Sequence, residues 1–196
     1  MWTSKLGAEV AVDVVAVCWL GFGAILVLGR SRSAKSDKKR DVTSHVGFLL
    51  QCVGCGMCFL FHRPYFSPMA SSEMLGLAIS IAAIAIAIAS EWLAFAAAIT
   101  LGKQWALVAR VIEGHELVER GPYGLVRNPI YLAMLGMLVA TGLAISYWQA
   151  LLAALIVFLV GNEIRIRSEE KLLREAFGTK FDDYARRVPA VFPRIL

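Results

Sequence analysis

Long runs without a charged residue recur along this chain of 196 residues and limit what it can fold into. Uncharged runs cover 46–61, 74–90 and 130–162, and a fourth apolar run, 6–29, carries only Glu9 and Asp13. A helix that crosses a bilayer needs about 20 apolar residues. A backbone in lipid must also satisfy its own hydrogen bonds, which favours helices over open strands. The pattern therefore predicts an all-α integral membrane protein.

The number of membrane spans follows from the lengths of these runs. The run 130–162 is too long for one span and short for two. Its Gly142 and the segment 146–149, which holds interfacial aromatics, predict a turn and a tight helical hairpin. About five transmembrane helices are expected, at 8–29, 45–61, 74–93, 129–145 and 148–163.

Candidate reactive side chains are unevenly distributed along the chain. Residues 1–100 are expected to form a three-span membrane region with few reactive groups. Residues 101–196 hold an amphipathic segment at 101–120, the hairpin, a helix leaving the membrane at 164–177, and a short terminal helix. We expect Thr179 to cap that terminal helix. The two regions are expected to form one integrated domain, with the chemistry in the second.

Basic residues predict the orientation in the membrane. If the amino terminus faces outward, only Lys5 and Arg63 of the 20 Lys and Arg residues lie outside. Basic residues concentrate on the cytoplasmic side of membrane proteins. The carboxyl terminus and the helices that follow the hairpin are therefore expected in the cytoplasm. Membrane lipids explain this basic charge better than nucleic acid does, so no nucleic-acid partner is expected.

Three cysteines, Cys52, Cys55 and Cys58, have a spacing shared by iron–sulfur ligands. They lie in an apolar run with glycines, and residues three apart on a helix form a stripe that suits close helix contacts. We interpret them as packing residues and expect no metal, with a metal or redox pair as the alternative. His45 and His62 are interpreted as marking the ends of this span.

The segment from Arg127 to Tyr131 has the features of a helix start beside a ligand site. Asparagine is among the best N-cap residues, and proline suits the first helical position, so Asn128 and Pro129 predict the start of a span. The amino-terminal end of a helix favours carboxylate or phosphate groups. Arg127 lies one turn before Tyr131, so a guanidinium and a phenol could converge on one ligand.

A second polar group follows the hairpin. Arg165 and Glu169 are four residues apart and share a helix face, with Glu170 beside them. Such a pair is often only a solvated ion pair of small energy. The short hairpin must however return Glu169 to the neighbourhood of Arg127, and ionisable groups at a membrane boundary are functional candidates. The two polar groups are therefore expected to form one site.

These two blocks resemble the isoprenylcysteine carboxyl methyltransferase family in its bacterial, integral membrane form. The first block is HELVERGPYGLVRNPIY at 115–131, and the second runs from Arg165 through EEKLL and the Phe177-Gly178 pair to 187–189. The segment LGKQW at 101–105 also resembles bacterial members. The resemblance covers about the last 95 residues and extends to the first three spans only in that they are spans.

The resemblance implies an S-adenosylmethionine-dependent methyltransferase whose acceptor partitions into the membrane. It makes 101–196 the cofactor-binding region and Arg165 the residue that orients the substrate. The family commonly has a histidine where this chain has Asn128, which can hydrogen-bond but cannot titrate. The cofactor-binding residues it implies are His115, Glu116, Leu117, Val118, Tyr123, Arg127, Asn128, Pro129, Ile130, Tyr131 and Glu169.

The type of acceptor follows from the available side chains. A carboxylate is already nucleophilic and needs only an orienting cation such as Arg165, whereas an ammonium must first lose a proton. The region has few neutral bases besides His115, which favours carboxyl methylation. An apolar tunnel between spans is expected to admit the lipophilic part of the acceptor. The alternatives are a phospholipid or amine N-methyltransferase and, in another class, a non-enzymatic membrane scaffold or small transporter.

Overall fold

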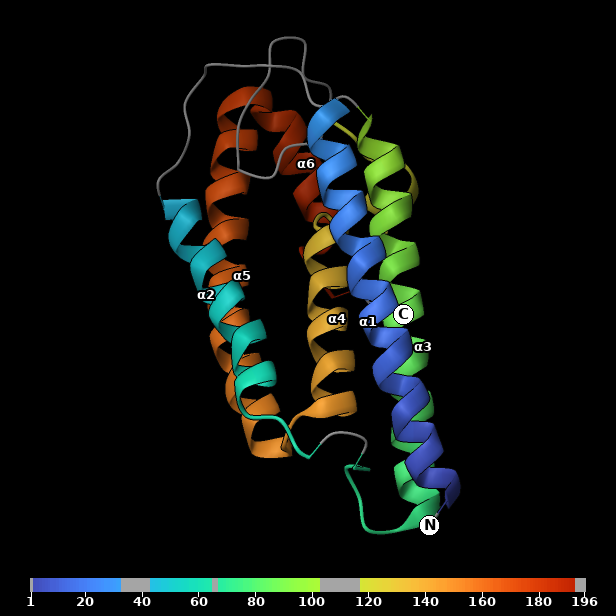
Figure 1. Cartoon of the computed structure of the whole chain (residues 1–196). Coiled ribbons are helices and arrows are strands. Elements are labelled where there is room, and N and C mark those ends of the chain that lie inside the picture. Colours follow the sequence, from blue (N-terminus) through green and yellow to red (C-terminus); the bar gives the residue numbers. More distant parts are fainter. Residues whose placement is uncertain (1, 33–42, 65–66, 103–116, 193–196) are drawn as a thin grey trace.

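The computed structural model describes residues 2–32, 43–64, 67–102 and 117–192, and this part of the chain is helical (Figure 1). Four of its helices are long and apolar enough to cross a membrane. The predicted class, an all-α integral membrane protein, is confirmed. The elements are α1 (Trp2–Arg32), α2 (Thr43–Leu60), α3 (Glu73–Leu101), the 3-10 turn η2 (Gly121–Gly124), α4 (Pro129–Ile145), α5 (Trp148–Phe177) and α6 (Thr179–Arg187).

The remaining expected span, at 129–145, is α4, which has 17 residues and is shorter than the other four. At 1.5 Å per residue it is about 26 Å long. Most of its residues are buried, and it contacts α1, α2, α3 and α5. A helix that is apolar on every side is typical of a bundle interior. α4 is therefore the central helix, and the expected set of five apolar helices is present.

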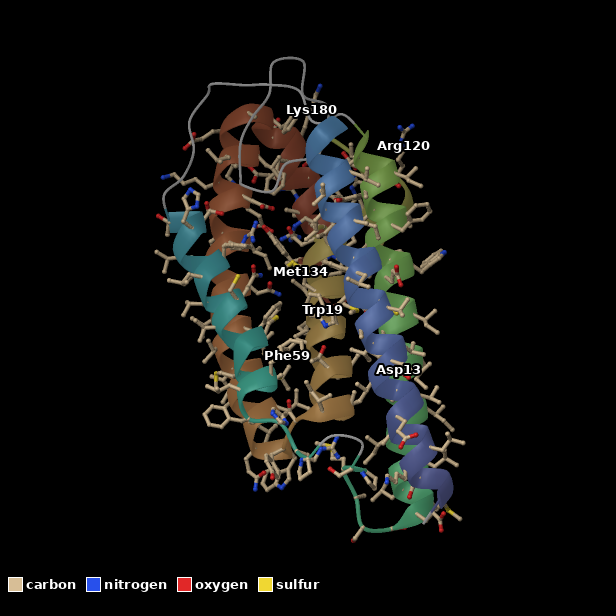
Figure 2. All side chains as sticks on the ribbon, viewed as in Figure 1. Asp13, Trp19, Phe59, Arg120, Met134 and Lys180 are labelled. Atoms are coloured by element: carbon tan, nitrogen blue, oxygen red, sulfur yellow. The ribbon has the colours of Figure 1, made fainter. Side chains whose placement is uncertain are left out.

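The other long helices form two pairs on either side of α4 (Figure 1). α1 lies along α3, and α2 lies along α5. Small residues such as Ala11 on α1 and Ala83 and Ala87 on α3 are fully buried in one cluster, and small side chains let membrane helices approach closely. Met134 of α4 packs against this cluster and against a second one shared with α2 and α5 (Figure 2). The interior is therefore continuous across the bundle.

Glycines allow an unusually close contact between α2 and α5. A Cβ atom added to Gly47 would lie 2.7 Å from the carbonyl oxygen of Gly161, and one added to Gly161 would lie 2.6 Å from that of Gly47. Gly54, two turns further along α2, would meet the Ala154 carbonyl at 3.0 Å. The two backbones thus touch, and Gln51, which lies between these glycines on the same face of α2, is buried against α5.

The cysteine stripe of α2 is only partly a packing stripe. Cys58 is completely buried, but Cys52 is exposed and Cys55 is half-buried. The packing interpretation is therefore confirmed for Cys58 and wrong for Cys52. The reason is that the glycines decide which face of α2 meets α5, so that the buried positions are Gly47, Gln51, Gly54 and Cys58.

The hairpin is less tight than the sequence predicts. α4 and α5 are joined through Ser146 and Tyr147, but α4 packs mainly on α3 and α5 packs mainly on α2. The glycine contact with α2 holds α5 away from α4, so the two helices diverge from the turn (Figure 1). Their open ends are where the predicted site residues lie.

Arg63 lies at the turn between α4 and α5, at the end of the hairpin opposite the predicted site. Its guanidinium is buried and donates to the carbonyl oxygens of Leu143 and Ala144 at 2.9 and 2.8 Å, and its backbone N–H donates to Ile145. A cation at a helix carboxyl end complements the helix dipole and satisfies carbonyls that have no helical partner. Arg63 therefore joins the end of α2 to the end of α4.

The predicted exit helix is the continuation of a span. Residues 148–163 and 164–177 form the single helix α5, which ends at Phe177 and is followed by Gly178, with φ of 54°. The terminal helix is confirmed as α6, but Gly178 is its N-cap and Thr179 its first residue, which corrects the predicted cap. Most of the expected amphipathic segment at 101–120 lies outside the described residues.

Candidate active site

Some of the site residues predicted from sequence lie outside the described residues, and the others lie within them. His115 and Glu116 lie outside the described residues, so their assignment stays a prediction. Leu117 and Val118 are half-buried, and Leu117 packs against a cluster built on Phe181 of α6. The remaining predicted residues lie on η2, at the start of α4 and on the far part of α5, which meet at one end of the bundle.

The turn η2 places Tyr123 inside the protein. Gly121, with φ of 60°, begins the turn, a conformation that favours glycine. The carbonyl oxygen of Tyr123 accepts a hydrogen bond from the Tyr184 hydroxyl at 2.7 Å, and its ring is buried. Burial and the Glu169 carboxylate raise the pKa of Tyr123 well above its ordinary value. Tyr123 is therefore a neutral phenol that lies near Glu169.

Arg127 anchors the carboxyl-terminal segment. Its Nε and Nη2 atoms donate to Glu170 Oε1 at 3.0 and 2.5 Å, and its Nη1 atom donates to the carbonyl oxygens of Ala185 and Val188. Its backbone N–H donates to the Pro189 carbonyl at 2.8 Å. These contacts turn the guanidinium toward α6 and the segment after it. A ligand contact by Arg127, expected from its spacing to Tyr131, stays a prediction.

Asn128 precedes α4 as predicted but does not cap it through its side chain. Its Nδ2 atom and its backbone N–H both donate to the Ala190 carbonyl at 3.0 Å. Pro129 occupies the first helical position and is buried, and Ile130 is half-buried. The tail at 188–190 thus runs across the start of α4, because main-chain groups of both segments pair there.

Tyr131 links the two predicted blocks. Its ring is buried, and its hydroxyl donates to Glu169 Oε1. The Arg165 guanidinium carbon lies 4.9 Å from the centre of the same ring. The carboxylate and the guanidinium on one face of α5 therefore meet one aromatic side chain from α4, as the hairpin argument predicts.

Arg165 is also held from the side of α2. Its side chain is buried, and its Nη1 atom donates to Gln51 Oε1 at 3.0 Å. The Phe48 ring centre lies 5.5 Å from its guanidinium carbon. Gln51 in turn donates through Nε2 to Asn162 Oδ1 at 2.5 Å. Cation–aromatic contacts and a hydrogen bond thus orient a buried guanidinium of α5 from α2 and α4.

Gln51 and Phe48 are site residues that sequence reasoning missed. Both come from the first half of the chain, where few reactive groups were expected. A signal was present: Gln51 is a polar residue in an uncharged run, with Gly47 and Gly54 three to four positions away on the same face. A polar side chain on a glycine-lined face is expected to meet a partner on the neighbouring helix.

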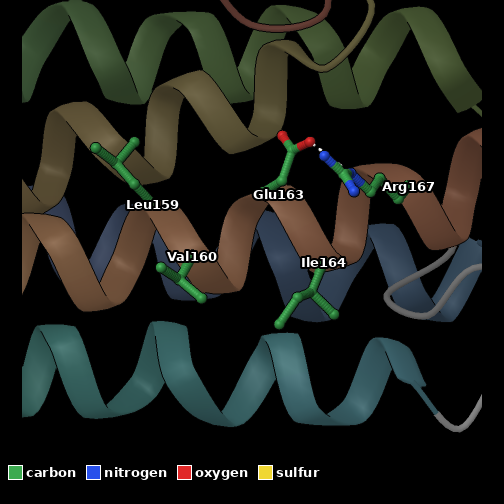
Figure 3. A pocket seen from close by; sticks show the side chains of 5 residues that line it. All are labelled: Leu159, Val160, Glu163, Ile164 and Arg167. Carbon is green, nitrogen blue, oxygen red and sulfur yellow. Dashed lines mark hydrogen bonds and ion pairs between the residues drawn. The ribbon is translucent and has the colours of Figure 1, made fainter.

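An open depression on α5 does not belong to this site. It is lined by apolar side chains and by the exposed ion pair of Glu163 with Arg167, at 2.6 Å (Figure 3). At 100° per residue, Glu163 and Arg167 lie on the side of α5 opposite Arg165. The depression is therefore not the acceptor tunnel expected from sequence, which stays a prediction. Its lining residues are Leu159, Val160, Glu163, Ile164 and Arg167.

The fold and the site define a helical membrane protein whose polar site lies at one end of the bundle. The phospholipid methyltransferase family model matches residues 78–180, which is more than half of the chain. The chain belongs to this family. The match begins inside α3 and includes η2, α4 and α5, so it crosses position 100, where the sequence suggested a boundary.

Curated relatives match a similar part of the chain. The nickel-cobalt-cadmium resistance protein NccN of Alcaligenes xylosoxydans xylosoxydans is 41% identical over 98 residues, or 49% of this chain and 45% of that protein. The protein-S-isoprenylcysteine O-methyltransferase B of Arabidopsis thaliana is 33% identical over 109 residues, covering 54% of this chain and 55% of that protein. A probable protein-S-isoprenylcysteine O-methyltransferase of Oryza sativa subsp. japonica is 29% identical over 119 residues, covering 60% and 62%. The chain thus spans about half the length of these relatives.

Proposed function

We propose that this protein transfers the methyl group of S-adenosylmethionine to a carboxylate on a lipophilic acceptor. Tyr131 is the observation that carries the proposal. Its hydroxyl bonds Glu169, the expected cofactor ligand, and its ring stacks on Arg165, the expected substrate residue. A donor site and an acceptor site would therefore share one wall. Membership of the phospholipid methyltransferase family supports a methyl donor as the cofactor.

The side chains present fit S-adenosylmethionine. This molecule is cationic at its sulfonium and ammonium groups, and Glu169 is a carboxylate that is not the partner of Arg127, which pairs with Glu170. When bound, it supplies a methyl group on a positively charged sulfur. Glu169 would hold a cationic group, Tyr131 would fix the Glu169 carboxylate, and Tyr123 would add an aromatic wall. The other residues proposed to hold it are Leu117, Val118, Arg127, Asn128, Pro129 and Ile130, with His115 and Glu116 before them.

Arg165 would orient the acceptor. Its guanidinium is buried, and in such surroundings its attraction for a carboxylate is far stronger than in water. The carboxylate is the nucleophile, so the protein need only hold it in line and exclude water. The apolar surfaces of the bundle would keep the remainder of the acceptor in the membrane.

Two alternatives make different demands on the same residues. A phospholipid or amine N-methyltransferase, suggested by the name of the family, would bring an ammonium toward Arg165, and the like charge opposes that approach. A non-enzymatic scaffold or small transporter requires no saturable cofactor binding. The name of the relative NccN concerns metal resistance, and among the described residues no group of three His, Cys, Asp or Glu is placed to hold a metal ion.

We place the site on the cytoplasmic side of the membrane. The residues that build it lie at the end of the bundle that holds Arg120 and Arg127, before α4, and the basic residues from Arg165 onward; basic flanks favour the cytoplasm. The amino terminus would then face outward. Labelling of single cysteines with a membrane-impermeant reagent in intact cells tests this orientation.

Cofactor binding separates an enzyme from a scaffold. Detergent-purified protein is titrated with S-adenosylmethionine labelled in the methyl group, and saturable binding is expected. Glu169→Ala is the matched control for specific binding, because it removes the proposed cationic-group ligand. Absence of saturable binding to the unmodified protein would exclude methyl transfer.

The stability of the methylated product in alkali distinguishes a carboxylate acceptor from an amine acceptor. The protein is incubated with a membrane lipid and metabolite extract and the labelled cofactor, and labelled products are identified by mass spectrometry. A methyl ester releases labelled methanol in alkali, whereas an N-methyl group does not. Base-labile label is expected, and base-stable label would support the amine alternative.

A further inference from the structure

Gln51 lies where α2 and α5 are closest. It is 1% exposed and one turn after Gly47, whose backbone touches that of Gly161. Asn162 and Arg165 lie on the facing side of α5 and are buried. The glycine contact therefore brings the Gln51 side chain of α2 to the Arg165 guanidinium.

The hydrogen bonds determine the orientation of the Gln51 amide. A guanidinium can only donate, so the atom that faces Arg165 must be the amide oxygen, at 3.0 Å. The amide nitrogen then faces Asn162 Oδ1, at 2.5 Å. Both halves of the amide are used, and a leucine or methionine of similar volume would lose both bonds. Asparagine would be one methylene too short to reach from α2.

The neutrality of Gln51 has a chemical consequence. A buried guanidinium is usually paired with a carboxylate, which cancels its charge toward a ligand. Glutamine offers an acceptor oxygen without a negative charge. The nearby Glu169 carboxylate is bonded to the Tyr131 hydroxyl and already attracts the Arg165 guanidinium. The Gln51 contact thus holds the guanidinium in place without adding a second negative charge that would oppose an anionic acceptor.

We propose that Gln51 is a positioning residue for Arg165 in the recognition of the acceptor carboxylate. This inference rests on the proposed function and extends the site to α2. Its amide holds the guanidinium between the rings of Tyr131 and Phe48, 4.9 and 5.5 Å from its central carbon. The expected ligand class is an amphiphile with a carboxylate at its polar end.

The test compares Gln51→Leu, which keeps volume, with Gln51→Glu, which keeps the acceptor oxygen and adds a charge. Binding of S-farnesyl-N-acetylcysteine and of oleate is measured beside their neutral carboxamides. A hydrogen bond to a charged group is worth about 1.5–3 kcal/mol, so Gln51→Leu is expected to weaken carboxylate binding about 10- to 100-fold. Gln51→Glu keeps the bond to Arg165 and is expected to weaken carboxylate binding because its negative charge competes with the acceptor for the guanidinium. Carboxamide binding and the Kd for S-adenosylmethionine are expected to stay within about twofold. With turnover, the loss is expected in the acceptor KM.

A double-mutant cycle shows whether Gln51 acts through Arg165. Gln51→Leu is expected to have no further effect on carboxylate binding once Arg165→Ala is present, because the two residues form one unit. Cys52→Ala, an exposed neighbour on α2, is the matched control and is expected to leave binding unchanged.

The outcomes separate this inference from the proposed function. Additive effects in the cycle, or equal losses for carboxylates and carboxamides, overturn the role of Gln51 while methyl transfer stands. The role of Gln51 is also overturned if the unmodified protein binds carboxylates no better than their carboxamides. If the protein binds no S-adenosylmethionine, the proposed methyl transfer is wrong. The preference for carboxylates over carboxamides is then measured without the cofactor and still tests the role of Gln51.

Discussion

Replacing Gly47 by alanine tests whether the helix contact controls the site. The added Cβ would lie 2.7 Å from the Gly161 carbonyl oxygen and 2.6 Å from Arg165 Cγ. An ordinary contact begins at 3.4 Å, so α2 and α5 must separate by about 0.7 Å, the difference between 3.4 and 2.7 Å. That separation would lengthen the 3.0 Å bond between Gln51 and Arg165 to about 3.7 Å, beyond hydrogen-bond range.

The magnitude of the effect follows from this clash. Overpacking of an interior typically costs about 1–3 kcal/mol. For a chain of this size, each kcal/mol corresponds to about 2–4 °C in Tm. Gly56→Ala is the matched control on the same helix, because its Cβ would meet nothing within 4 Å. Both variants gain about 1 kcal/mol of helix propensity, so the comparison isolates the contact.

Thermal unfolding in detergent and binding of a carboxylate amphiphile are the two assays. Gly47→Ala is expected to unfold about 2–12 °C below Gly56→Ala and to weaken carboxylate binding as Gln51→Leu does. If Gly47→Ala matched Gly56→Ala in both stability and binding, the backbone contact would not position the site.

Three further predictions concern single side chains. Glu169→Ala is expected to abolish S-adenosylmethionine binding, whereas Arg165→Ala is expected to spare binding and impair turnover. Equilibrium binding and initial rates measure the two effects, and the reverse pattern would exchange the roles assigned to Glu169 and Arg165. Arg127→Met is expected to expose the tail to proteolysis, because it removes the bonds to Glu170 and to the α6 carbonyls; unchanged cleavage rates in limited proteolysis would contradict the anchor. Cys55→Ala is expected to change methyl-transfer rates less than about twofold, because the half-buried thiol only packs against its neighbours; loss of activity together with bound metal, measured by elemental analysis, would restore the metal alternative.

Arg127 shows how a site residue can serve the fold instead. Its position before α4 suggested a ligand-binding cation, but its guanidinium bonds Glu170 and the carbonyl oxygens of Ala185 and Val188. These bonds hold the carboxyl-terminal segment over the start of α4. The segment in turn contributes Val191 to the cluster around Tyr131. Arg127 therefore supports the site through the tail that it anchors.

The all-α membrane class, the apolar helices, the hairpin and the pairing of the two polar blocks were readable from sequence. Run length and charge report directly on a bilayer, which admits few backbone arrangements. A turn between Ile145 and Trp148 then had to bring Glu169 back toward Tyr131, and their hydrogen bond confirms it. These features depend on residues near one another in the chain or on a short connection.

Only the tertiary structure decided which helix faces meet. Small residues lie on more than one face of α2, and the polar Gln51 indicates a neighbouring helix but not which one. The sequence of α2 therefore does not show that Gly47, Gln51 and Gly54 rather than Cys52 turn toward α5. That choice depends on backbone contact with Gly161, 114 positions after Gly47 in the chain. Helices in lipid gain little from burying apolar surface, so close packing and interhelical hydrogen bonds select their partners. The place of Gln51 beside Arg165 follows from that packing.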